Sequence, residues 1–132
     1  MRVVIGGAHN GKREYVKRLL ENVQYQWIDC SAGDLKFPPD GKVVIDRIEQ
    51  WLAQTDLSEA EAVEFIMKSI EGKDVIFILT DIGRGIVPMD AEQRMLRDAC
   101  GRLYQRLIAQ ADDVTRIWYG LAQTLKKRGE MI

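Results

Sequence analysis

The residues best suited to chemistry stand at positions 6–13, GGAHNGKR, directly after the apolar run Val3-Val4-Ile5. The spacing of Gly6, four residues, then Gly11 and Lys12 is typical of a phosphate-binding loop. In such a loop the glycines let backbone N–H groups close around phosphates, while the lysine meets the outer phosphates. The loop therefore predicts a site for GTP or ATP. Its members are Gly6, Gly7, Ala8, His9, Asn10, Gly11, Lys12 and Arg13.

The last position of this motif departs from the pattern. A Ser or Thr is expected there, because its hydroxyl normally ligates Mg²⁺. The sequence has Arg13 instead, a permanent cation that cannot ligate a metal ion. Arg13 could partly replace the metal as a charge clamp on the phosphates, which would preserve nucleotide binding without restoring chemistry. Whether Mg²⁺ binds is therefore left open by the sequence.

Two aspartates are candidates for the carboxylate that helps to hold the metal in phosphate-loop proteins. Asp46 and Asp81 each end an apolar run. The carboxyl ends of parallel strands form the edge where open α/β sheets bind ligands, so both aspartates could share a site with Lys12. We predict Lys12, Asp46 and Asp81 as the catalytic residues, with the two aspartates on Mg²⁺. Asp29 is a further candidate, and the alternative for each aspartate is a helix cap.

The loop motif is informative only when a strand precedes it and a helix follows it. A Val- and Ile-rich run covers residues 2–6, and Val16, Leu19, Leu20 and Val23 then recur at helical spacing. The alternative is a glycine-rich turn that only connects this strand to this helix. We take phosphate binding as the interpretation that this context favours.

Further elements alternate along the rest of the chain. Strands are predicted at residues 2–6, 24–29, 42–46, 74–80 and 114–119, and the tail from Gly120 could return as a short hairpin. Helical spacing follows the third strand, the capping pair Ser58 and Glu61, and the start signals Pro88 and Asp90. The pattern predicts one α/β domain over residues 1–132, with a mainly parallel central sheet of about five strands flanked by helices.

Composition excludes several classes of function. A formal net charge of −1 gives no electrostatic footprint for nucleic acid. We recognise no signal peptide and no run of the ~20 apolar residues that a membrane span needs, so a cytoplasmic protein is expected. Cys30 and Cys100 lack the paired spacing of a zinc site and are predicted to be buried small hydrophobes.

Residues 83–114, GRGIVPMDAEQRMLRDACGRLYQRLIAQADDV, and 120–126, GLAQTLK, carry a more specific pattern. Together with VVIDRIEQWL at 43–52 and the loop GGAHNGKR, they resemble the bifunctional adenosylcobinamide kinase and adenosylcobinamide-phosphate guanylyltransferase family, and the stretches stand in family order. The matching residues of the first two stretches are Gly83, Gly85, Ile86, Val87, Pro88, Arg94, Arg97, Asp98, Gly101, Gln105, Ala111, Asp112, Val114, Gly120, Leu125 and Lys126. Asp46, Trp51 and Leu52 match upstream.

The resemblance implies a phosphate-loop NTPase fold of the recombinase-like type, assembled as a homotrimer. It also implies an enzyme of cobalamin biosynthesis that phosphorylates the corrinoid adenosylcobinamide and then transfers GMP through a guanylylated histidine. Within the matched block, Arg94, Arg97 and Asp98 could serve an interface or form ion pairs on a helix surface.

Departures from the family pattern limit what this resemblance implies. The family's nucleophilic histidine lies in a segment between the second and third strands, where this chain has only the loop 31–42 without histidine. The single histidine, His9, lies in the phosphate loop, a poor position for in-line attack on an α-phosphate. Guanylyl transfer by the covalent route is therefore predicted to be lost. Tyr104 and Ala122, in place of the family's Asn and Pro, put the substrate contacts in question.

Two hypotheses remain open at this point. In the first, the chain is a shortened enzyme that transfers a phosphoryl group from GTP or ATP to a cobinamide-like alcohol. In the second, it is a noncatalytic paralogue that binds nucleotide or corrinoid and regulates, or assembles with, an active relative. Retention of Lys12, Asp46 and Asp81 favours the first, whereas Arg13 and the missing histidine segment favour the second.

Overall fold

The computed structural model describes residues 1–81 and 90–132. Gly83, Gly85, Ile86, Val87 and Pro88 of the matched block lie outside these residues. The strands are β1 (Arg2–Gly6), β2 (Tyr25–Asp29), β3 (Lys42–Asp46), β4 (Asp74–Thr80), β5 (Asp113–Trp118), β6 (Leu121–Lys127) and β7 (Glu130–Met131). The helices are α1 (Lys12–Leu19), α2 (Ile48–Gln54), α3 (Glu59–Ser69) and α4 (Ala91–Gln110), and a short 3₁₀ helix spans Cys30–Ala32.

The strands form one mixed sheet in the order β2-β3-β4-β1-β5-β6-β7. Strands β1 to β5 run parallel to one another, and β6 and β7 are added beside β5 as antiparallel neighbours. The predicted α/β fold with a mainly parallel sheet is confirmed, and so is the return of the tail as a hairpin. Because β6 and β7 add to the sheet, the described residues contain seven strands rather than about five.

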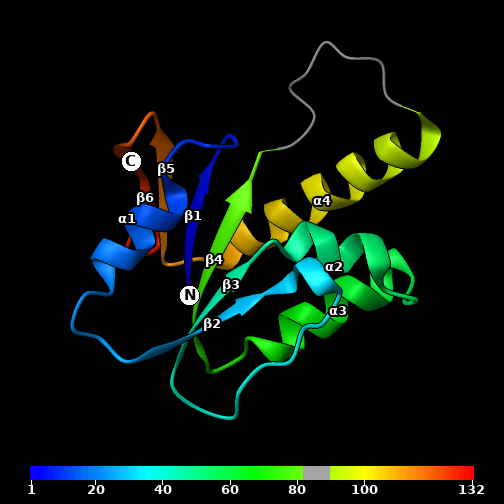
Figure 1. The fold of residues 1–132 in the computed structure, drawn as a ribbon, viewed down its shortest axis with the longest axis horizontal. Coiled ribbons are helices and arrows are strands. Elements are labelled where there is room, and N and C mark those ends of the chain that lie inside the picture. Colours follow the sequence, from blue (N-terminus) through cyan, green and yellow to red (C-terminus); the bar gives the residue numbers. More distant parts are fainter. Residues whose placement is uncertain (82–89) are drawn as a thin grey trace.

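Helices cover both faces of the sheet, with α1 on one face and α2, α3 and α4 on the other (Figure 1). The larger core lies under α2, α3 and α4, and a smaller core joins α1 to the opposite face. Residues 75–79 of β4 are all buried, as expected for a central parallel strand that is covered on both faces. This layering brings the carboxyl ends of the parallel strands to one edge.

The predicted apolar stripe of the first helix is only partly correct. Val16 and Leu20 are buried, but Leu19 and Val23 are 38% and 42% exposed. The helix stops at Leu19, and Asn22 then adopts a left-handed backbone with φ 67°. Val23 therefore lies beyond the helix, because the chain turns toward β2 within three residues of the end of a helix of only eight residues.

Two polar side chains attach α4 to the sheet. The hydroxyl of Tyr104 donates to the carbonyl of Thr80 at 3.0 Å, and burial, reinforced by the charge of Glu49, raises the pKa of this hydroxyl. The Nζ of buried Lys126 donates to the carbonyls of Ile108 and Ala109 at 3.1 and 3.0 Å. Tyr104, which departs from the family pattern, and Lys126, which matches it, thus both help to hold this fold together.

Several local predictions are confirmed. Ser58 and Glu61 form the reciprocal capping box that starts α3. Both cysteines are buried free thiols, and burial raises the pKa of Cys30 and of Cys100 to about 12. Arg97 Nε lies 3.2 Å from Asp98 on α4, which is the ion-pair alternative proposed for that pair. Among the described residues, no helix is long and apolar enough to cross a bilayer.

Candidate functional site

Residues 7–11 connect β1 to α1, so the motif lies between a strand and a helix as predicted. Gly6 is required by a close approach of two strands, because a Cβ at this position would lie 2.4 Å from the carbonyl oxygen of Ile117. Gly11 precedes α1 with φ 88°, a backbone conformation that favours glycine. The two glycines at the ends of the motif therefore meet steric demands of the strand–loop–helix turn.

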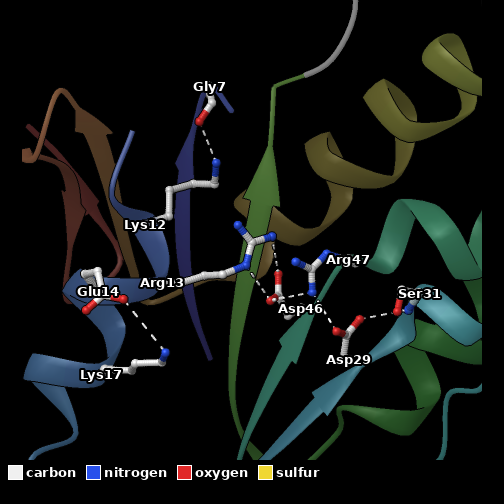
Figure 2. A network of polar contacts seen from close by, with 9 residues as sticks. All are labelled: Gly7, Lys12, Arg13, Glu14, Lys17, Asp29, Ser31, Asp46 and Arg47. Carbon is white, nitrogen blue, oxygen red and sulfur yellow. Dashed lines mark hydrogen bonds and ion pairs between the residues drawn. The ribbon is translucent and has the colours of Figure 1, made fainter. Parts of the chain in front are cut away.

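Lys12 lies folded within its own loop. Its side chain is 2% exposed, and Nζ donates to the carbonyl of Gly7 at 2.6 Å (Figure 2). Burial lowers the pKa of Lys12, and the adjacent Arg13 charge lowers it further, while Asp46 and Glu49 oppose the shift. A phosphate oxygen placed in the loop would exchange a neutral carbonyl partner for an anionic one, which is the stronger hydrogen bond.

Asp46 faces α1 because of the alternation of side chains along β3. Val43 and Ile45 pack into the core under α2, α3 and α4, whereas Val44 packs into the core under α1. Asp46 has the same parity as Val44 and is 1% exposed. The strand thus brings a buried carboxylate to the same face as the first turn of α1.

Arg13 binds this carboxylate. Its Nε and Nη2 donate to the two oxygens of Asp46 at 2.7 and 3.0 Å, and the side chain reaches across from α1 to the end of β3 (Figure 2). The hydrogen bond with Asp46 raises the pKa of Arg13 further above its ordinary value. A two-bond guanidinium–carboxylate pair is the strongest geometry available to these groups. Arg13 and Asp46 thus hold the loop and β3 together.

Arg47 joins a second aspartate to this pair. Asp29 and Asp46 are register partners on β2 and β3, and Arg47 Nη1 lies 2.6 Å from the former and 3.5 Å from the latter. Two neighbouring carboxylates repel each other, so Arg47 between them is stabilising. It does this from a left-handed backbone, with φ 59°. Figure 2 shows Arg13, Asp46, Arg47 and Asp29 as one chain of contacts.

For Asp29 the helix-cap alternative is correct. Its carboxylate accepts from the backbone N–H of Ser31 at 2.9 Å, at the start of the 3₁₀ helix. Partial burial would raise the pKa of Asp29, but the Ser31 hydrogen bonds and the Arg47 charge outweigh it and keep that pKa below its ordinary value. Asp46 does not cap α2, whose N-cap residue is Arg47 and has no side-chain capping hydrogen bond.

Glu49 is a site residue that sequence reasoning missed. Its buried Oε2 has no hydrogen-bond partner among the described residues. Burial raises the pKa of Glu49, Asp46 raises it further, and the charges of Arg13 and Lys12 oppose the shift. Its one sequence signal is an acidic residue between the buried Ile48 and Trp51, and that signal is weak, because acidic residues are common in the first turn of any helix.

Asp81 lies on the other side of the loop. Its backbone N–H donates to the carbonyl of Gly6 at 2.9 Å, which joins the end of β4 to the end of β1. Asp81 lines a cavity of about 450 Å³, which Gly7, Asn10 and Arg116 also line. The structure therefore places Asp81 beside the phosphate loop, and it places Asp46 in contact with Arg13.

The residues around the loop fit Mg²⁺ poorly. Both oxygens of Asp46 are bound to Arg13, and Arg13 itself stands where the metal-binding hydroxyl is expected. Within residues 1–81 and 90–132, no three His, Cys, Asp or Glu side chains are grouped so that they could hold a metal ion. The assignment of Asp46 and Asp81 to Mg²⁺ stays a prediction, and the contacts of Asp46 argue against it.

Comparisons with known proteins add to this geometry. Residues 34–125 match the model of the family described as cobinamide kinase / cobinamide phosphate guanyltransferase, which is more than half of the chain. The bifunctional adenosylcobalamin biosynthesis protein CobU of Salmonella typhimurium is 38% identical over 52 residues. These residues make up 39% of this chain and 29% of that protein, so the match spans less than a third of the relative's length.

Proposed function

The chain belongs to the cobinamide kinase / cobinamide phosphate guanyltransferase family, and on this premise we propose that it is a nucleotide-binding homologue acting in cobalamin biosynthesis. The nucleotide is GTP or ATP, held by residues 6–13. Its site works without Mg²⁺, because Arg13 supplies the positive charge that the metal supplies elsewhere. Guanylyl transfer through histidine is lost in this chain.

The Arg13–Asp46 pair is the observation that carries this proposal. Asp46 is almost wholly buried and both of its oxygens are bound, so a metal ion would have to displace a guanidinium to reach it. Arg13 is 34% exposed at the first turn of α1 and keeps donor capacity toward a phosphate. Its guanidinium would then bridge the nucleotide and Asp46.

Each residue of the loop has a part in this binding. Lys12 Nζ would exchange the Gly7 carbonyl for an outer phosphate oxygen, and the start of α1 would add the positive end of its dipole. Asp46 would hold Arg13 in place rather than ligate an ion. Of the three residues predicted to be catalytic, Lys12 and Asp81 keep that role for a phosphoryl transfer in which Asp81, beside the loop, faces the acceptor alcohol, whereas Asp46 acts through Arg13.

The loss of guanylyl transfer rests on His9. This residue is the only histidine of the chain, and it lies within the loop with φ 62°. A nucleotidyl acceptor must approach the α-phosphate in line with the leaving pyrophosphate. A residue of the wrapped loop itself is poorly positioned for that approach.

A noncatalytic paralogue is the second candidate, and the same ion pair favours it. Phosphoryl transfer depends on electrostatic stabilisation of the transferred group, and Mg²⁺ held by protein ligands normally supplies much of it. With Asp46 bound to Arg13, the site would bind nucleotide or a corrinoid and regulate, or assemble with, an active relative. Release of ADP or GDP on incubation with adenosylcobinamide separates the two candidates. A homotrimer, as the family resemblance implies, is tested by sedimentation.

Titration calorimetry with GTP and with ATP in the presence of EDTA tests nucleotide binding. Saturable binding to the unmodified protein is expected, together with its loss in Lys12→Ala. Arg18→Ala is the matched control, since Arg18 is an exposed cation on the same helix. No binding by the unmodified protein, or equal binding by Lys12→Ala, would contradict the proposed site.

A further inference from the structure

The turn between β5 and β6 lies against the phosphate loop. The backbone N–H of Gly120 donates to the carbonyl of Asn10 at 3.0 Å, and a Cβ on Gly11 would lie 3.6 Å from Gly120 Cα. Figure 1 shows the tip of this hairpin beside the loop that follows β1. Residues more than 100 positions apart in sequence thus form one surface at the mouth of the loop.

Tyr119 lies in this turn with a backbone conformation that a tyrosine rarely adopts. Trp118 pairs with Leu121, so Tyr119 and Gly120 alone form the turn, with φ 50° and 76°. Positive φ at both central residues defines a hairpin turn that prefers Asn-Gly or Asp-Gly. A bulky residue is rare in this conformation, and such strain is concentrated at functional sites. The geometry of the turn therefore does not explain why position 119 is a tyrosine.

The aromatic rings here are turned to solvent. Trp118 is 57% exposed and Tyr119 is 78% exposed, and their ring centroids lie 5.7 Å apart. The guanidinium of Arg116 lies 5.5 Å from the centre of the Trp118 ring. Trp118 and Arg116 also line the cavity that Gly7 and Asn10 of the phosphate loop border. Flat apolar surface and positive charge are therefore continuous with the loop.

The order of the strands gives the direction in which a bound nucleotide extends. Lys12 binds the outer phosphates, and the Arg13–Asp46 pair places the further positive charge toward β3. The sheet order β3-β4-β1-β5 puts the aromatic turn on the opposite side of the loop. In a nucleoside triphosphate the outer phosphates and the base are at opposite ends. The base of a nucleotide bound in this way is therefore directed to the β5–β6 turn.

We propose that Trp118 and Tyr119 form a stacking surface for the purine base of the nucleotide held on residues 6–13. This inference rests on the proposed function. Stacking on an aromatic face tolerates any base, because each base has a π-face. The pair therefore strengthens binding of GTP and ATP alike and leaves the choice between them to other contacts.

Tyr119→Asn tests this stacking while keeping the turn, since Asn is a preferred residue at that position. Affinities for GTP and for inorganic tripolyphosphate are measured in EDTA. We expect the variant to bind GTP roughly tenfold more weakly and tripolyphosphate unchanged, because only the nucleotide has a base. Leu121→Ala, a change of an exposed apolar residue on the same hairpin, is the control that should alter neither affinity. In the unmodified protein, GTP should quench the total tryptophan fluorescence, to which Trp118 contributes, more than tripolyphosphate does.

The outcomes separate this inference from the proposed function. If the unmodified protein binds neither probe, the phosphate site itself is wrong, and stacking falls with it. If it binds both, and Tyr119→Asn weakens GTP and tripolyphosphate equally or not at all, the stacking surface is wrong and the phosphate site stands. If sedimentation shows that Tyr119→Asn changes only the oligomeric state, the pair is an interface between copies of the chain, and stacking is also overturned.

Discussion

The guanidinium of Arg13 and the carboxylate of Asp46, 33 residues apart in sequence, form a two-bond ion pair at 2.7 and 3.0 Å. The carboxylate is 1% exposed and the guanidinium 34% exposed. Because Asp46 is buried, removing Arg13 would leave its charge without the two-bond partner, with Arg47 Nη1 at 3.5 Å as an ion-pair partner among the described residues. Arg13, which stands where a hydroxyl is expected, thus compensates the negative charge of the buried Asp46.

Glu49→Gln should stabilise the protein at neutral pH and not in acid. The folded protein raises the pKa of Glu49, mainly through burial, above its ordinary value of 4.5. Below that ordinary value the side chain is neutral in both folded and unfolded chains and contributes nothing. As the pH rises past it, the unfolded chain ionises first, and folding loses stability. We expect the variant to gain on the order of 1 kcal/mol in urea unfolding at pH 7.

The matched comparison for Glu49 is Glu64→Gln, which changes an exposed carboxyl on α3. That variant should unfold like the unmodified protein at both pH values. A gain for Glu49→Gln that is equally large below pH 4 would show that the effect is not electrostatic.

Lys126→Met should lower the free energy of unfolding by about 2 kcal/mol, whereas Lys127→Met should change it little. Lys126 is buried and donates to two carbonyls in the last turn of α4, which the substitution leaves without that partner. Lys127 is exposed on the same strand. Urea unfolding of the two variants measures this difference, and equal stability would refute a structural role for Lys126.

Tyr119→Asn should raise the free energy of unfolding by about 0.5–1 kcal/mol, because Asn adopts a left-handed backbone at less cost than Tyr. Thermal unfolding in the absence of nucleotide measures it. A gain in stability together with a loss of GTP affinity is the signature of a strained binding residue. A loss of stability would mean that the ring of Tyr119 supports the hairpin.

Incubation with labelled GTP should leave no label covalently bound to the protein. His9 is the only histidine, and its place in the wrapped loop is a poor position for attack in line with the leaving pyrophosphate. Denaturing electrophoresis at alkaline pH, which preserves phosphorus–nitrogen bonds to histidine, would detect a guanylylated product. Label that survives and disappears in His9→Ala would refute the proposed loss of guanylyl transfer.

The sequence predicted the elements that depend on local patterns. The strand–loop–helix order around residues 6–13, the capping box at Ser58 and the position of Asp46 at the end of a strand follow from short-range spacing. The first helix was predicted too long, because Val23 continues the apolar spacing after the backbone has turned at Asn22. Local patterns do not report where a helix loses its tertiary support.

Contacts between distant segments could not be predicted in the same way. The spacing of Arg13 and Asp46 says nothing about whether a guanidinium of α1 can reach β3, because that depends on the strand order. Glu49 reads as an ordinary acidic residue in a first helical turn until its burial is known. Tyr119 needed the backbone angles of the turn before its position became informative.

The most direct test of the account is calorimetric titration with GTP of the unmodified protein and of Arg13→Ser, each with Mg²⁺ and with EDTA. If Arg13 takes the place of the metal, as proposed, the unmodified protein should bind GTP equally well under both conditions. Arg13→Ser restores the hydroxyl and releases Asp46, so this variant should bind GTP more tightly with Mg²⁺ than with EDTA. Binding by the unmodified protein that requires Mg²⁺, or an Arg13→Ser variant indifferent to Mg²⁺, would contradict the account.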